Sequence, residues 1–214
     1  MKHIFVGDIH GKYEVVSKAL DMDGHKVFVG DFLDSYDRNT DDMEKCLTLV
    51  IEALEKDECT VILGNHELSY MDHQRWGCSG FSVETAEMFS HYKGKLVMMA
   101  VPFYIPTEDF LVTHAGLDNY YWTNYGFTLG NLPDRLDGFL SNTNHDLYGV
   151  GRCRGGSKNV GGIFWNDFLR EHTPVPELHQ VFGHTRVPEI SVKGTSVCID
   201  CLDSNDASFF EVDL

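Results

Sequence analysis

Five short segments of the chain place a metal-capable side chain directly after a run of β-prone residues. Carboxylate, amide and imidazole groups suit a hard-to-borderline divalent ion such as Mn²⁺, Fe²⁺ or Zn²⁺. Ligands of open α/β sheets bind at the carboxyl ends of the strands, so segments far apart in sequence can converge. The five are Gly7-Asp8-Ile9-His10-Gly11, Gly30-Asp31, Gly64-Asn65-His66-Glu67, Thr113-His114-Ala115-Gly116 and Gly183-His184-Thr185.

These segments contain six candidate metal ligands, which are too many for one open catalytic ion and suit two ions that share a bridging carboxylate. Each segment alone is a weak signal, because a histidine at a strand end is more often a hydrogen-bonded core residue than a ligand. Five in order, each after a β-prone run, predict a two-metal centre. The candidates are Asp8, His10, Asp31, Asn65, His114 and His184.

The elements that must position these side chains alternate in the first third of the chain. We expect strands at residues 2–6, 26–29 and 59–63, and helices at residues 13–20 and 41–56. The second helix has apolar residues at helical spacing, and Asp41 and Glu44 are placed to cap its start. A β-α-β-α-β series predicts a parallel sheet.

The remaining two thirds of the chain predict shorter elements. Residues 118–162 are rich in Asn, Gly, Asp and aromatic side chains, and we expect them to form a loop-rich lobe over the site. No repeat or linker is evident, which favours a single domain over residues 1–214. We expect a helix at residues 81–92 and strands at residues 96–101, 104–105, 110–113, 180–182, 189–192, 196–199 and 208–212.

Composition limits the function classes. The chain has 214 residues with a net charge of −16, which argues against stable nucleic-acid binding, because that needs a basic face. Bound metal ions can still make a site attractive to an anionic substrate. No apolar run approaches the roughly 18–20 residues that span a bilayer. The first residues lack a signal-peptide core, so we expect no membrane association and a cytoplasmic protein with six free cysteines.

In their order along the chain, the motifs GDIHG, GDFLD, GNHE, THAG and GHT resemble those of the calcineurin-like metallophosphoesterases, and within them the phosphoprotein phosphatase branch. The resemblance spans residues 7–185, and the small size is similar to that of compact bacterial or phage members. It implies an α/β fold, a four-layer αββα sandwich of two mixed β-sheets flanked by helices, with the ions at the strand ends. By this resemblance Asp8 and His10 bind one ion, Asp31 bridges, and Asn65, His114 and His184 bind the other.

The same resemblance implies hydrolysis of phosphomonoesters, with phosphoserine and phosphothreonine in proteins as substrates, by in-line attack of a hydroxide that bridges the two ions. His66 would donate a proton to the leaving alkoxide, and Asp34 would orient this imidazole. Mn²⁺ is the expected metal, with Fe, Zn and Ni as alternatives. The expected partner is a phosphorylated protein or a small phosphoester.

The chain departs from the family pattern where Ser35 replaces an arginine directly after Asp34. Either Arg38 reaches the phosphate from three residues further on, or the loop is reshaped and Asp37 replaces Asp34. Asp34 keeps the family spacing of three residues after Asp31, which favours the first alternative, with Asp34 as the partner of His66 and Arg38 as the phosphate ligand. A second phosphate-binding arginine is expected at Arg154, since glycines beside it allow close backbone approach. The other candidates are Arg152 and Arg75.

Two other functions remain open. The same dimetal site could serve a dinucleoside polyphosphate hydrolase or a phosphodiesterase, for which the aromatic stretch at residues 118–127 could stack a base. A metal-free scaffold that binds a protein partner is the third hypothesis. Such a scaffold should lose its metal ligands first, and here all six positions keep competent side chains.

Overall fold

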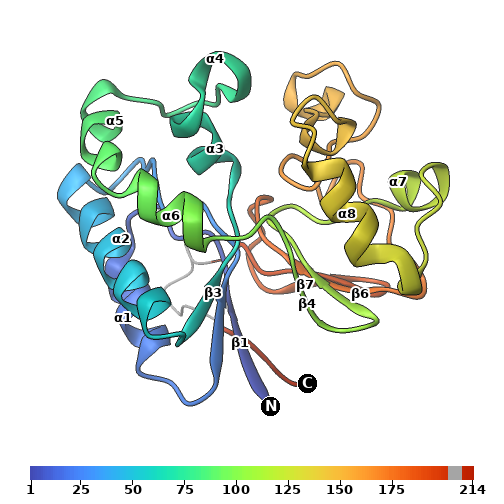
Figure 1. Cartoon of the computed structure of the whole chain (residues 1–214), viewed down its shortest axis with the longest axis horizontal. Coiled ribbons are helices and arrows are strands. Elements are labelled where there is room, and N and C mark those ends of the chain that lie inside the picture. The colour runs from blue at the N-terminus through green and yellow to red at the C-terminus, as the bar shows by residue number, and fades with distance from the viewer. Residues whose placement is uncertain (202–208) are drawn as a thin grey trace. The chain divides into compact units, whose positions relative to one another are not determined.

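The computed structural model describes residues 1–201 and 209–214 (Figure 1). Within these residues the chain forms two compact units. The first unit comprises residues 1–101 together with the described C-terminal residues 209–214, and the second comprises residues 102–201. Each unit contains one mixed β-sheet with helices beside it, which confirms the predicted α/β class. The single-domain interpretation stays a prediction.

The first unit is built on a four-stranded sheet with the strand order β3-β2-β1-β9. The first three strands are parallel and β9 is antiparallel to β1. Parallel neighbours need long crossovers, and helices α1 and α2 supply them, as the alternating pattern predicts. The bounds are β1 (Lys2–Val6), α1 (Tyr13–Leu20), β2 (His25–Phe28), α2 (Thr40–Glu55), β3 (Cys59–Val61) and β9 (Phe210–Asp213). Residue 208 of the expected last strand lies outside the described residues.

Helix α2 carries the main apolar face of this unit. Met43, Leu47 and Val50 are buried at helical spacing in the core beside the sheet. The expected cap at Asp41 or Glu44 is wrong. Asn39 has the extended backbone of an N-cap residue, and its side chain accepts a hydrogen bond from the Asp42 N–H at 3.0 Å.

Four further helices follow β3 in the first unit: α3 (Asn65–Met71), α4 (His73–Trp76), α5 (Val83–Ser90) and α6 (Lys93–Met99). The expected strand at residues 96–101 is wrong, because most of it belongs to α6. Leu96 is fully buried in the core whereas Met98 is 79% exposed, so the apolar run has one buried helical face. Only Val101 pairs as predicted, in an isolated parallel bridge with Ile62.

The second unit contains a five-stranded sheet with the order β4-β5-β6-β8-β7. Strands β5, β6 and β8 are parallel neighbours, and the edge strands β4 and β7 are antiparallel to theirs. The predicted strands of this region are confirmed with small shifts at their ends. The bounds are β4 (Tyr104–Thr107), β5 (Phe110–Val112), β6 (His179–Phe182), β7 (Ser191–Lys193) and β8 (Ser196–Cys198).

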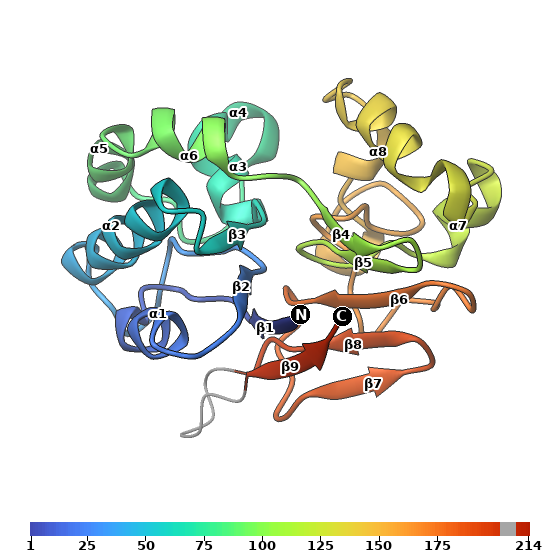
Figure 2. The same ribbon diagram turned by 60° about the horizontal axis from the view of Figure 1, so that its bottom comes forward.

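Residues 118–162 are more helical than the sequence predicts. Figure 2 shows helices α7 and α8 in this segment of the second unit. Tyr121 is almost fully buried, and its hydroxyl donates to the Val160 carbonyl at 2.7 Å, so this aromatic residue belongs to the interior of the unit. The bounds are α7 (Asn119–Asn124), η1 (Leu129–Asn131), α8 (Leu132–Leu140), η2 (Asp146–Tyr148) and η3 (Arg152–Arg154).

Two sequence expectations concern the whole chain. All six cysteines are free thiols, as predicted, and four of them are buried. Among the described residues, every helix is too short or too polar to traverse a bilayer.

Candidate active site

The loops that follow β1 and β2 are tied together by their backbones. The N–H groups of Ile9 and His10 both donate to the Asp31 carbonyl, at 3.1 and 2.7 Å. His10, Asp31 and Asp34 have positive φ angles of 45°, 52° and 57°. Such angles are uncommon for residues with a Cβ, and their cost must be offset by surrounding contacts. The cross-loop hydrogen bonds are one such set of contacts.

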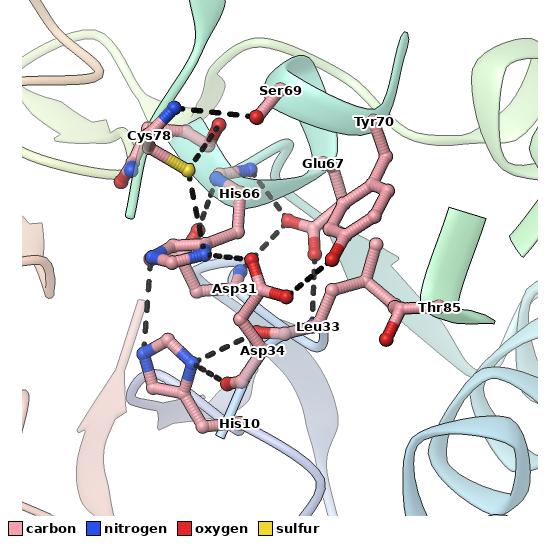
Figure 3. Close-up of polar contacts among 12 residues, drawn as sticks. His10, Asp31, Leu33, Asp34, His66, Glu67, Ser69, Tyr70, Cys78 and Thr85 are labelled. Carbon is pink, nitrogen blue, oxygen red and sulfur yellow. Dashed lines mark hydrogen bonds and ion pairs between the residues drawn. The ribbon is translucent and has the colours of Figure 1, made fainter. Parts of the chain in front are cut away.

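The carboxylate of Glu67 provides a second set. This side chain is fully buried, and both its oxygens accept backbone hydrogen bonds (Figure 3). Oε2 accepts from Asp31 at 2.8 Å and from Gly64 at 3.0 Å, and Oε1 accepts from Phe32 at 2.8 Å and from Leu33 at 3.3 Å. The sequence analysis did not single out Glu67. Glu67 lies three residues after Gly64, the N-cap of α3, and a glutamate at that position is typical of a capping box. This spacing is the sequence feature that indicates a structural role for Glu67.

The imidazole of His10 is oriented by two carbonyl groups. Its Nδ1 lies 2.9 Å from the Leu33 oxygen and 2.6 Å from the Asp34 oxygen. A carbonyl oxygen can only accept, so Nδ1 carries the proton in the neutral ring and Nε2 presents its lone pair. A hydrogen bond from one ring nitrogen to a carbonyl is the usual support of a metal-binding histidine.

Asp31 lies between two imidazoles. Its Oδ2 is 3.9 Å from Nε2 of His10 and 3.9 Å from Nε2 of His66. Its Oδ1 accepts from the His66 backbone N–H at 3.0 Å. Gly64 packs against this carboxylate so closely that an added Cβ would lie 2.1 Å from Oδ1. Ligand atoms of His10, Asp31 and His66 all lie within 4.8 Å of one another. His10 and Asp31 are the predicted ligands of a divalent ion here, and His66 lies beside them as the predicted proton donor.

His66 is paired with Asp34, the partner expected from the sequence. Nδ1 of the imidazole lies 2.6 Å from Asp34 Oδ2, and the Tyr70 hydroxyl donates to Asp34 Oδ1 at 2.5 Å (Figure 3). Burial lowers the pKa of His66, but the charge of Asp31 and the hydrogen bond to Asp34 outweigh burial and raise this pKa well above its ordinary value. In the protein without metal ions, the two carboxylates therefore favour the protonated imidazole.

The other predicted ligands of the first unit lie in the same loops. Asp8 lies two residues after the end of β1 and is 2% exposed. Asn65 is the first residue of α3, directly before His66, and is also buried. The placement of both agrees with the expectation that polar side chains follow the strands at their carboxyl ends.

The second unit brings two predicted ligands together. His114 and His184 follow the parallel neighbours β5 and β6, and Nε2 of His114 lies 3.1 Å from Nδ1 of His184. Two nitrogens bound to one ion at about 2.1 Å would be about 3.0 Å apart at an octahedral angle and about 3.4 Å apart at a tetrahedral angle, and the observed spacing lies between these values. The spacing of these imidazoles therefore suits two ligands of one ion.

Arg154 lies beside His184 in this unit. Its Nε is 2.9 Å from Asp167 Oδ2, and its Nη2 donates to the His184 carbonyl at 3.3 Å and to Thr185 Oγ1 at 3.1 Å. The side chain is 29% exposed, so part of the guanidinium faces solvent while Asp167 holds it.

The arginine expected in the first unit has a different environment. Arg38 Nη1 lies 2.7 Å from Glu14 Oε1. The neighbouring Asp37 is mostly exposed and accepts from the Ser35 hydroxyl at 2.8 Å, whereas Asp34 reaches His66. The phosphate-binding role of Arg38 stays a prediction. The alternative candidates are placed elsewhere: Arg75 lies over the Trp76 ring, 5.2 Å from its centroid, and Arg152 is exposed.

A family model for calcineurin-like phosphoesterases matches residues 1–206. The chain belongs to this family. The match confirms the resemblance found in the motifs and the assignment of the chain as an enzyme that acts on phosphoesters. No curated protein sequence matches the chain significantly.

Solved structures similar to this calcineurin-like phosphoesterase include a cold-active protein-tyrosine phosphatase of the psychrophile Shewanella sp., with 17% identity over 94% of this chain and 71% of that chain and a TM-score of 0.62. Another is a point mutant of a cold-active protein tyrosine phosphatase, with 17% identity over 98% and 74% of the two chains and a TM-score of 0.66. At this identity the similarity supports a shared fold.

Calcineurin-like phosphoesterases typically bind divalent metal ions. The residues of this chain fit such ions on two observations. The imidazole of His10 is held with its Nε2 lone pair directed to the carboxylate side of the cluster. The donors at the predicted positions are oxygen and imidazole nitrogen, which suit Mn²⁺, Fe²⁺ or Zn²⁺.

Proposed function

We propose that this calcineurin-like phosphoesterase is a metal-dependent phosphatase that hydrolyses phosphomonoesters, with phosphoserine and phosphothreonine side chains of proteins as its substrates. The observation that carries the proposal is the His66 imidazole, held by Asp34 at 2.6 Å and lying beside two predicted metal ligands, Asp31 and His10. That arrangement pairs a proton donor with a place for cations, which is what cleavage of a phosphomonoester requires.

The ions would be held by the six residues predicted from the sequence, with Mn²⁺ as the expected metal. When bound, two divalent ions activate a water molecule and neutralise the charge of the phosphoryl group. The chain must then orient its ligands. The Leu33 and Asp34 carbonyls fix the ring of His10, and Glu67 fixes the backbone that carries Asp31.

The proton for the leaving group would come from His66. Asp34 accepts from Nδ1, so the ring is fixed and the proton on Nε2 is the one available to the substrate. The hydroxyl of Tyr70 holds the other carboxylate oxygen, so Asp34 keeps its orientation. Arg154 and Arg38 would bind phosphate oxygens, for which a guanidinium offers paired N–H donors.

The proposed substrates follow from the need for this donor. The oxygen of serine or threonine leaves as a strongly basic alkoxide, whereas a phenol titrates near pH 10 and leaves more easily. A positioned general acid therefore contributes most to the cleavage of alkyl phosphates, by about 10²–10⁴-fold. The structurally similar cold-active enzymes are named as protein-tyrosine phosphatases, so their names favour a phosphorylated protein as substrate, and the preference for serine and threonine phosphates rests on the proton donor.

The test compares wild type with His66→Asn on two substrates in the presence of Mn²⁺. We expect the substitution to lower kcat for a phosphoserine peptide by about 10²–10⁴-fold and to lower kcat for p-nitrophenyl phosphate much less. The bound manganese should be unchanged. His91→Asn is the matched control, because His91 is an exposed histidine at the end of α5.

Three results would contradict the proposal. Equal losses with both substrates would remove the proton-donor role of His66. Absence of hydrolysis with any divalent ion would remove the phosphatase function. A preference for dinucleoside polyphosphates or phosphodiesters over both monoesters would select the alternative substrate class that the sequence left open.

A further inference from the structure

Cys78 lies against the imidazole that the proposed reaction uses. Its Sγ is 3.5 Å from His66 Nδ1, the same nitrogen that lies 2.6 Å from Asp34 Oδ2 (Figure 3). Ligand atoms of Asp34, His66 and Cys78 all lie within 4.8 Å of one another. Neither the sequence motifs nor the proposed function gives Cys78 a role.

The loop that carries Cys78 is packed closely around this position. The Cys78 N–H donates to the Ser69 hydroxyl of α3 at 3.3 Å. Gly80, with a φ of +94°, packs against Asp34 so closely that an added Cβ would lie 2.9 Å from the Asp34 Cβ. Contacts on both sides of Cys78 therefore hold its thiol beside the imidazole and the carboxylate.

The arrangement is not a relay for a cysteine nucleophile. A catalytic histidine in such a relay uses one ring nitrogen for the nucleophile and the other for the carboxylate. Here the thiol and the carboxylate lie at the same nitrogen of His66. Three donors of different chemistry around one point are instead the pattern of a metal site.

The distances suit a tetrahedral ion with a sulfur ligand. Zinc binds imidazole nitrogen at about 2.05 Å and thiolate sulfur at about 2.3 Å, and a tetrahedral angle then separates the two atoms by about 3.5 Å. The observed separation of Cys78 Sγ and His66 Nδ1 is 3.5 Å. The contact between His66 Nδ1 and Asp34 would have to widen to about 3.3 Å, because an ion would take the place of the shared proton.

We propose that Asp34, His66 and Cys78 form a separate binding site for a thiophilic divalent ion, Zn²⁺ in particular, and that its occupation inhibits the enzyme. A thiolate ligand selects Zn²⁺ over Mn²⁺ or Mg²⁺, whereas the predicted ligands of the catalytic ions include no sulfur. Cys78 is only half-buried, so solvent can reach the site and a water molecule can complete the coordination.

Binding replaces the proton on His66 Nδ1 and the thiol proton of Cys78, both of which pass to solvent. The ion then occupies Nδ1 in place of the proton shared with Asp34, so the ring is a neutral, metal-bound imidazole and no longer the imidazolium that the proposed reaction uses as its acid. The inhibition therefore rests on the proposed function, whereas the binding of the ion does not.

The binding test uses Co²⁺ as a spectroscopic substitute for zinc, added to the Mn²⁺-loaded protein. We expect a thiolate-to-cobalt charge-transfer band that saturates near one equivalent, that is lost in Cys78→Ser, and that Zn²⁺ abolishes by displacement. Cys153→Ser is the matched control, since Cys153 is the other half-buried cysteine and should leave the band intact. The absence of a band in wild type, or its persistence in Cys78→Ser, would overturn the site.

The inhibition test measures turnover of a phosphoserine peptide at fixed Mn²⁺ against increasing Zn²⁺. Wild type and Cys153→Ser should lose half their activity at a zinc concentration at least tenfold below that needed for Cys78→Ser. Equal sensitivity of all three proteins would place the inhibition at the catalytic ions and refute the proposed regulation. A cobalt band in a protein without phosphatase activity would support the binding site and refute the proposed function.

Discussion

Replacing Glu67 with glutamine tests whether this buried carboxylate holds the loop that carries Asp31. The substitution preserves shape but changes the donors and acceptors. The carboxylate accepts two N–H groups on each oxygen, from Gly64 and Asp31 on Oε2 and from Phe32 and Leu33 on Oε1. A glutamine amide has one oxygen and one NH₂ group. In either orientation, two backbone N–H groups face the NH₂ group and lose their acceptor.

The size of the effect follows from those contacts. A hydrogen bond to a charged acceptor contributes about 1.5–3 kcal/mol, so losing two of them should lower the free energy of unfolding by about 3–6 kcal/mol. That is a large part of the roughly 5–15 kcal/mol that stabilises a typical domain. Because Asp31 is one of the released residues, Mn²⁺ affinity should fall as well.

The assay is urea unfolding of the metal-free protein, followed by circular dichroism, with Mn²⁺ titration calorimetry as the second readout. Glu87→Gln is the control, because Glu87 is exposed on α5 and its replacement should change stability by less than about 0.5 kcal/mol. A loss of less than about 1 kcal/mol for Glu67→Gln, with unchanged Mn²⁺ affinity, would show that the loop keeps its conformation without the carboxylate and would refute the reasoning.

Three further predictions concern pH and the pair around His66. Asp34→Asn should lower kcat for a phosphoserine peptide by about 10²-fold or more at unchanged metal content. Tyr70→Phe should lower kcat by less than about tenfold. Equal losses in the two variants would contradict the proposal that Asp34 directly orients His66. Manganese bound at pH 7.5 should dissociate as pH approaches 5, measured by metal analysis after dialysis, because histidine ligands must be neutral. Burial lowers the pKa of His172 to about 4 with help from the charge of Lys193. Since the unfolded state takes up this proton first, stability should fall by roughly 3 kcal/mol between pH 6.5 and 4 in urea unfolding of metal-free protein, and His172→Gln should remove that part of the slope.

The parts of the fold that the sequence predicts well are those in which local pattern and tertiary context agree. The helix at Tyr13–Leu20 and the strand at Lys2–Val6 have the predicted bounds. The strand expected at residues 96–101 fails because a short apolar run has no period that distinguishes a strand from a buried helix. The helix that forms there buries Leu96 and leaves Met98 exposed, a division set by the core of the first unit and not by local preference.

The N-cap of α2 fails for a related reason. Asp41, Asp42 and Asn39 can all cap a helix, so residue type alone does not distinguish them. The start of the helix decides between them, and the helix begins at Thr40, where the chain leaves the extended backbone of Asn39. Predicted element ends are therefore less secure than the elements themselves.

For the candidate site too, the sequence predicts some parts and not others. It predicts the side chains that would bind ions or transfer protons, but not the backbone groups that orient them. A metal ligand must be a particular side chain, so its identity and its place after a strand can be read from the sequence. The groups that orient His10 are the carbonyls of Leu33 and Asp34, which any residue at those positions would offer. Their direction depends on the positive φ of Asp34 and on the Glu67 carboxylate that holds the loop backbone, and both follow from tertiary contacts between separate segments. The precision of the site thus depends on backbone geometry, so Glu67→Gln should disturb it by releasing backbone N–H groups rather than by altering a ligand side chain.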